Sequence, residues 1–83
     1  MSKLVSIVGL GIAGAGLAHF VKPELFEDIT AIAFPDDTEQ HIYMDGAAET
    51  VLGLALAVPK TRRLGVIGLL GYGGYLAVSV LKN

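Results

Sequence analysis

The sequence predicts an all-α membrane protein with three transmembrane helices and a short amphipathic interfacial helix after the first. Hydrophobic residues make up 53% of its 83 residues and glycine contributes 11 more, whereas only 17% are charged, below the roughly 25% of soluble domains. The charges gather in residues 22–49 and 60–63, which leaves a long uncharged stretch on either side of this part of the chain. We expect residues 1–83 to form a single membrane domain, because a chain this short supports only one.

The first span is expected at about residues 4–21, where Ser6 and His19 are the only polar side chains. As a helix this stretch would be about 27 Å long, close to the ~30 Å hydrocarbon core of a bilayer. Pro23 ends it at Lys22, because the residue before a proline is pushed out of the α region.

The interfacial helix is expected at about residues 23–33, with Pro23 in its first turn. Its apolar residues recur along one side, at Leu25, Phe26, Ile29 and Ile32. A short helix of this kind lies in the plane of the membrane interface.

The other two spans are expected at about residues 39–58 and 64–81. The third span is free of charge, whereas the second carries Asp45 and Glu49 into the membrane. Pro59 ends the second span, because proline cannot continue a helix interior.

The expected orientation follows from lysine and arginine, which are enriched in cytoplasmic loops. Four of them lie on the side of the N-terminus and two on the other side, namely Lys3, Lys60, Arg62 and Arg63 against Lys22 and Lys82. This bias predicts a multi-pass protein with a cytoplasmic N-terminus and an outer C-terminus, and we expect it in a bacterial plasma membrane.

Composition excludes several classes of function, while the N-terminus leaves two alternatives open. The chain has no Cys, which excludes disulfides and thiolate metal sites, and a net charge of −2 argues against nucleic-acid binding. Gly9, Gly11 and Gly14 have the G-x-G-x-x-G spacing of a dinucleotide-binding fold, which would make residues 4–8 and 29–34 strands. Lys3 and the apolar stretch after it also fit a signal peptide.

Five polar side chains are expected at overlapping depths in the outer half of the membrane: His19, Asp45, Glu49, Tyr72 and Tyr75. Asp45 and Glu49 follow His41 at intervals of four residues and so share one helix face. Because an acid within a span costs ~2.5–3.5 kcal/mol, it tends to have a partner. We expect Glu49 to accept a hydrogen bond from Tyr72 or Tyr75, and His19 to face Asp45 or Glu49.

This polar cluster is interpreted as a clamp that holds the helices together or docks them on a neighbour. Two alternatives are a metal site, since histidine and carboxylates at this spacing suit one, and a proton relay or quinone site built on Glu49.

Glycines predict close helix packing. Gly65, Gly68, Gly71 and Gly74 recur every third residue, and small-residue pairs occur in the first two spans, at Gly9, Ala13, Gly16, Gly53 and Ala57. Such surfaces gain from van der Waals contact at close approach. One set of small residues is needed to pack the chain's own helices, and the remaining ones suggest contact with another protein.

The order of several motifs resembles that of small DoxX-like membrane proteins. The motifs are His19-Phe20, Pro23-Glu24, Phe26, Phe34-Pro35, Gly46–Glu49, Leu52–Leu54 and Pro59–Leu64, and they cover roughly residues 10–70. Members of that family usually have four spans, and some are membrane subunits linked to thiol, sulfur or quinone redox enzymes. The resemblance implies an accessory membrane protein and supplies no catalytic residues.

We therefore expect a non-catalytic accessory subunit of a larger membrane complex, in contact with lipid and not with nucleic acid, and without a cofactor or metal of its own. A respiratory or other redox assembly is expected only from the company of the resembled family. The alternative is an independent redox-linked component that binds quinone or another small molecule near Glu49.

Overall fold

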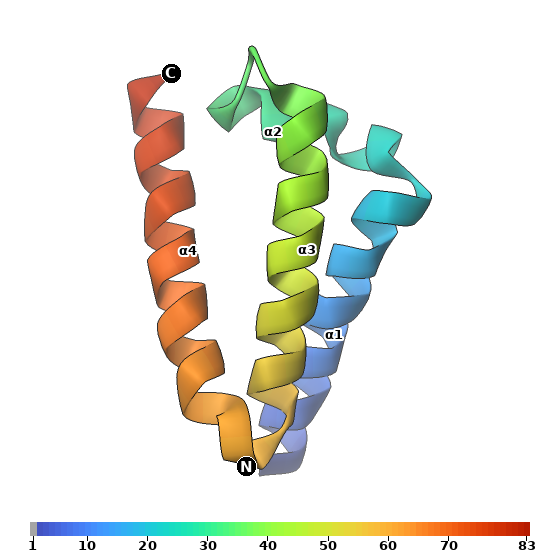
Figure 1. The fold of residues 1–83 in the computed structure, drawn as a ribbon, viewed down its shortest axis with the longest axis vertical. Helices are drawn as coiled ribbons and strands as arrows, with labels where there is room; N and C mark the ends of the chain where they lie inside the picture. Colours follow the sequence, from blue (N-terminus) through green and yellow to red (C-terminus); the bar gives the residue numbers. More distant parts are fainter. Residues whose placement is uncertain (1) are drawn as a thin grey trace.

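The computed structural model describes residues 2–83, of which Ser2 only by its backbone, and in this range the chain is helical throughout (Figure 1). The helices are α1 (Ser2–Val21), η1 (Pro23–Phe26), α2 (Glu27–Ala33), α3 (Thr38–Ala57), η2 (Pro59–Thr61) and α4 (Arg62–Lys82), where η1 and η2 are short 3-10 helices. The predicted all-α class is confirmed. The strands of the dinucleotide-binding alternative are wrong, because residues 4–8 lie inside α1 and residues 29–33 inside α2.

The three long helices lie side by side along the 38 Å long axis of the molecule (Figure 1). The N-terminus and η2 are at one end, and the C-terminus is at the other, where α2 lies across the ends of the long helices. The expected interfacial helix is divided between η1 and α2, because the segment that Pro23 opens begins as a tight 3-10 turn.

Helices α1 and α3 make the most extensive contact in the molecule, and glycine makes it possible. A Cβ atom added to Gly53 would lie 2.5 Å from the backbone nitrogen of Ala13, and one added to Gly16 would lie 2.5 Å from that of Thr50. Backbone therefore packs directly on backbone, as expected for the small residues of the first two spans.

The backbone of α4 approaches α3 closely only near η2. Gly65 rests against the backbone of Leu56, and Gly68 against the side chain of Leu52. Farther along, α4 diverges from α3 (Figure 1), and Gly71, Gly73 and Gly74 have no neighbour within 4 Å of an added Cβ.

The end near η2 is held together by Arg62. Its Nε donates to the carbonyl of Leu56 at 2.9 Å, and its Nη2 donates to the Ser6 hydroxyl at 2.8 Å and to the carbonyl of Ala57 at 3.2 Å. Ser6 also donates to Ala57 at 2.8 Å. One guanidinium thus covers the last carbonyls of α3, which have no partner within the helix, and ties α1 and α4 to them.

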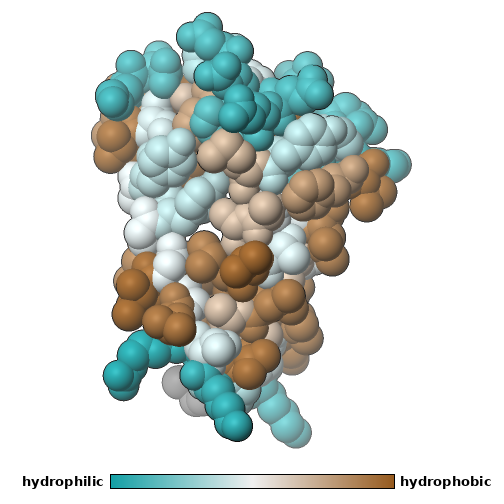
Figure 2. All heavy atoms as spheres, viewed as in Figure 1, coloured by the Kyte–Doolittle hydropathy of each residue, from teal (hydrophilic) through white to brown (hydrophobic). Residues whose placement is uncertain are grey.

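Most of the large apolar side chains lie on the surface of the molecule. Only small or medium apolar side chains are buried, namely Ala13, Ala33, Ile42 and Leu56, whereas Leu70 is 74% and Leu81 86% exposed. Figure 2 shows an apolar band between two hydrophilic ends. This distribution suits a chain whose long helices face lipid or another protein.

Length and apolarity qualify two helical segments as candidate membrane spans, Lys3–Val21 and Pro59–Lys82. Two of the three expected spans therefore meet this criterion, and the third does not. Helix α3 is long enough, but Glu39, Asp45 and Glu49 make it too polar. The two qualifying helices give weak support to a membrane location, and the single membrane domain stays a prediction.

Candidate functional site

The predicted polar side chains meet where α4 has diverged from α3. His19 comes from the end of α1, Asp45 and Glu49 from the middle of α3, and Tyr72 from the middle of α4. His19 is 4% and Asp45 8% exposed, while Glu49 and Tyr72 are half-buried. All four are part of one region of the molecule, but they form two separate pairs.

The first pair is His19 with Glu49, as expected, with Nε2 and Oε2 3.4 Å apart. The other ring nitrogen, Nδ1, lies 2.7 Å from the carbonyl oxygen of Ala15. A carbonyl only accepts, so Nδ1 carries a proton and Nε2 is left to share one with Glu49. The imidazole is further fixed by Phe26, whose ring stacks on it with centroids 3.6 Å apart.

The second pair is Tyr72 with Asp45, and here the expected acceptor was wrong. The Tyr72 hydroxyl donates to Oδ1 of Asp45, not to Glu49. Four residues turn a helix by about 40° beyond one full turn, so Asp45 faces α4 while Glu49 faces α1. Tyr75 is exposed, and its ring lies beside those of Phe34 and Tyr72, with centroids 5.8 Å away in each case.

His41, the third residue in the spacing of Asp45 and Glu49, does not join them. Its ring stacks on Phe34 with centroids 3.7 Å apart, and its Nδ1 lies 3.0 Å from the carbonyl of Asp37. Within residues 2–83, no three histidine or acidic side chains are arranged to hold a metal ion. The metal alternative for the polar cluster therefore has no geometric support.

A cavity of about 340 Å³ opens beside the two pairs. His19, Asp45 and Glu49 form its polar side, and α2 covers it with Ile29, Thr30 and Ala33. Phe26, Phe34, Leu76 and Val80 complete its lining. The cavity is thus an apolar space with one acidic wall.

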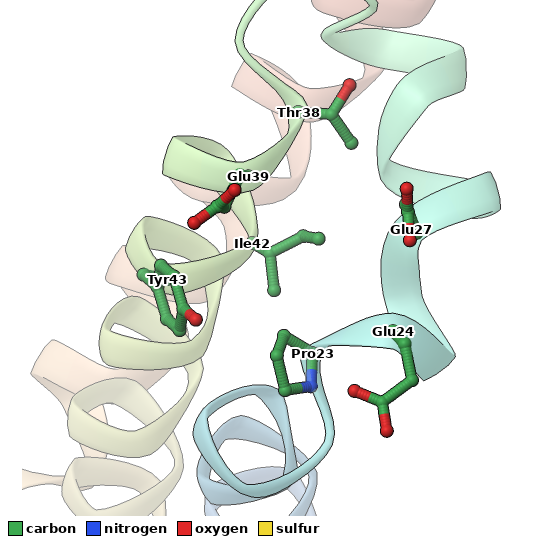
Figure 3. A pocket seen from close by; sticks show the side chains of 7 residues that line it. All are labelled: Pro23, Glu24, Glu27, Thr38, Glu39, Ile42 and Tyr43. Atoms are coloured by element: carbon green, nitrogen blue, oxygen red, sulfur yellow. The ribbon is translucent and has the colours of Figure 1, made fainter.

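A second hollow, of about 300 Å³, lies between the start of α3 and the segment of η1 and α2 (Figure 3). Glu24, Glu27 and Glu39 border it together with Tyr43 and Ile42. The three carboxylates stay apart around the hollow instead of converging. It is an acidic surface without the geometry of a binding centre.

The glycine stripe of α4 divides into two halves with different surroundings. Gly65 and Gly68 are used within the chain, whereas Gly71 and Gly74 remain open. The open pair lies between two large apolar side chains of the same face, Ile67 and Val78, which are 60% and 54% exposed.

Sequence reasoning missed the role of Arg62, which was expected only to set the orientation in the membrane. No spacing rule connects it with Ser6, which is 56 positions away. The available signal was its position three residues after Pro59, close to the end of α3, where unpaired carbonyls need donors.

A family model described as "Domain of unknown function (DUF8561)" matches residues 8–80, and the chain belongs to this family. The resemblance to DoxX-like proteins is therefore wrong: motifs spread along an apolar chain can occur in the same order in an unrelated family. The expected link to respiratory or other redox assemblies depended on that resemblance and loses its basis. No curated protein and no solved structure matches the chain.

Proposed function

We propose that this member of a family without an assigned function is a small integral membrane protein with three spans that serves as a non-catalytic accessory subunit of a larger membrane complex. The observation that carries the proposal is the open face of α4, where Gly71 and Gly74 have no partner within the chain. The apolar band in Figure 2 and the many exposed apolar side chains of the long helices support the membrane location.

Helix α3 is proposed as the third span because of where it packs. It lies against α1 from Gly46 to Ala57, over most of its length, so it must cross the same thickness if α1 does. Its 20 residues would be about 30 Å long, which matches the hydrocarbon core. Asp45 and Glu49 have partners on neighbouring helices, which lowers the cost of carrying them into the membrane.

The proposed orientation has the N-terminus and η2 in the cytoplasm and the C-terminus outside. Lys60, Arg62 and Arg63 then lie on the cytoplasmic side together with Lys3, in agreement with the positive-inside rule. The acidic segment of η1 and α2 lies in the outer interface, above the polar cluster.

A structural role for the polar cluster is supported by the way its members satisfy one another. Every buried side-chain nitrogen or oxygen in the described part of the chain has a hydrogen-bond partner. Paired groups of this kind join three helices, as a clamp does. On this proposal the cluster sets the angle of α4 and so presents its outer face to the partner.

The partner is proposed to dock on the face of α4 formed by Ile67, Gly71, Gly74 and Val78. Small residues between larger ones let a second helix approach closely and contact both sides. Glycines such as Gly16 and Gly53 are already used in the contact between α1 and α3, whereas the face on α4 is open to a partner.

The test is to recover partner proteins with the tagged chain in mild detergent and to compare the wild type with variants that carry a bulky side chain on different sides of α4. Gly71→Leu and Gly74→Leu place a bulky group on the proposed face, while Gly73→Leu places it on another side at the same depth. A Cβ atom added at any of the three positions has no neighbour within 4 Å, so we expect all three variants to fold. We expect a companion protein that is retained with wild type and Gly73→Leu and lost with the other two. Equal recovery with all four proteins contradicts the docking face.

A further inference from the structure

We propose that the cavity beneath α2 binds an amphipathic organic amine in its protonated form, with the ammonium group at the acidic wall and the apolar body beneath α2. This inference goes beyond the accessory role and does not depend on it. It follows from the charge, the hydrogen-bonding capacity and the shape of the cavity.

The charge of the wall is unbalanced. Asp45 and Glu49 both border the cavity, and His19 is the only basic side chain that lines it. The wall therefore holds two acidic groups and one basic group, so one acidic group is left without a basic counterpart. Because charges interact strongly at low dielectric, an incoming cation is favoured over a neutral or anionic molecule.

The hydrogen-bonding capacity of the wall selects in the same direction. Its donors are already engaged, since Tyr72 donates to Asp45 and the two nitrogens of His19 face Ala15 and Glu49. Each carboxylate has about four lone-pair positions, so acceptor capacity remains at the wall. A ligand group that binds these carboxylates must therefore bring donors. A quinone head group offers only acceptors, whereas a protonated amine offers donors and a charge together.

The shape and lining fit the rest of such a molecule. A volume of about 340 Å³ lies at the small end of the range for ligand pockets, about 300–1,000 Å³. Ile29, Leu76 and Val80 supply apolar surface. Phe26 and Phe34 add aromatic rings, which attract cations through their faces.

The experiment measures binding to the purified full-length chain in detergent by isothermal titration calorimetry. The probes are phenylbutylamine, its neutral counterpart phenylbutanol, and duroquinone. The amine is expected to bind saturably and at least about tenfold more tightly than the alcohol, because it adds a charge-assisted hydrogen bond. Duroquinone is expected to bind more weakly than the amine.

Equal affinity for the amine and the alcohol overturns the proposal and makes the cavity a space for any apolar chain, such as a lipid tail. Preference for duroquinone overturns it in favour of a quinone site. Both comparisons use the wild-type chain and therefore decide the question without any variant.

Variants then locate the site. Glu49→Gln and Asp45→Asn each remove one charge from the wall and keep an oxygen acceptor, and either should weaken amine binding about tenfold. The matched control is Glu27→Gln, which removes one charge from α2 outside the cavity and should leave binding unchanged. Circular dichroism verifies that each variant is folded. A folded Glu49→Gln or Asp45→Asn protein that binds the amine as wild type does contradicts this assignment.

Discussion

Replacing Gly53 by alanine should destabilise the protein by separating α1 from α3. The added Cβ would lie 2.5 Å from the nitrogen of Ala13, 2.6 Å from the carbonyl oxygen of Gly9 and 3.0 Å from the Cα of Ala13. All three are backbone atoms, so no side chain can rotate away. The closest approach falls about 0.9 Å short of the 3.4 Å at which ordinary contact begins, and the helices must move apart by nearly that distance.

The expected cost combines two opposing effects. A gap of 0.5–1 Å forfeits roughly a quarter to a half of the dispersion energy of the atoms it separates, and overpacking costs about 1–3 kcal/mol. Alanine returns about 1 kcal/mol through its higher helix propensity. Because the contact extends along most of both helices, we take the upper part of the range and expect a net loss of about 2 kcal/mol.

The matched control is Gly11→Ala, on the exposed side of α1, where an added Cβ has no neighbour within 4 Å. That change should be neutral or stabilise the protein by up to about 1 kcal/mol. The free energies of unfolding are compared by titrating both variants and the wild type with sodium dodecyl sulfate in mixed micelles. Variants of equal stability, within about 0.5 kcal/mol, would refute the close packing of α1 on α3.

Two further predictions concern the groups that join the helices. Tyr72→Phe should destabilise the protein by about 1–3 kcal/mol, because it leaves the buried carboxylate of Asp45 without its donor, whereas Tyr75→Phe should be nearly neutral. The same titration compares the free energies of unfolding of the two variants, and equal effects contradict the Tyr72–Asp45 pair. Arg62→Ala should lower the free energy of unfolding by about 2 kcal/mol through the loss of charge-assisted hydrogen bonds. Arg63→Ala, at an exposed position, should change it by less than about 0.5 kcal/mol. An effect of Arg63→Ala as large as that of Arg62→Ala would show that charge alone matters at this end.

The helices could be predicted because their limits depend on local chemistry. Pro23 and Pro59 mark two boundaries, and the long uncharged stretches mark α1 and α4. Close packing of the first two long helices was also foreseeable, since the pairs Gly9/Ala13 and Gly53/Ala57 place small residues four positions apart, as in helices that approach closely.

The partners within the polar cluster depended on rotations that the sequence does not encode locally. Placing Asp45 and Glu49 on one face was correct to within about 40°, yet this residual rotation decides which of them meets Tyr72. The clamp of Arg62 on Ser6 needs the register between α1 and α3, which only the folded packing sets. The divergence of α4 from α3 could not be predicted either. The glycines of α4 recur evenly in the sequence, whereas only Gly65 and Gly68 pack against a neighbouring helix.

The central claim is that α3 crosses the membrane together with α1 and α4, and single cysteines test it most directly. The chain has no Cys of its own, so Asp36→Cys, between α2 and α3, and Lys60→Cys, in η2, can be labelled with a membrane-impermeant maleimide in intact cells. Three spans place these two positions on opposite sides: Asp36→Cys should react at once, and Lys60→Cys only after permeabilisation. Labelling of both positions in intact cells would contradict the account, because the two loops would then lie on one side and α3 would not cross the membrane.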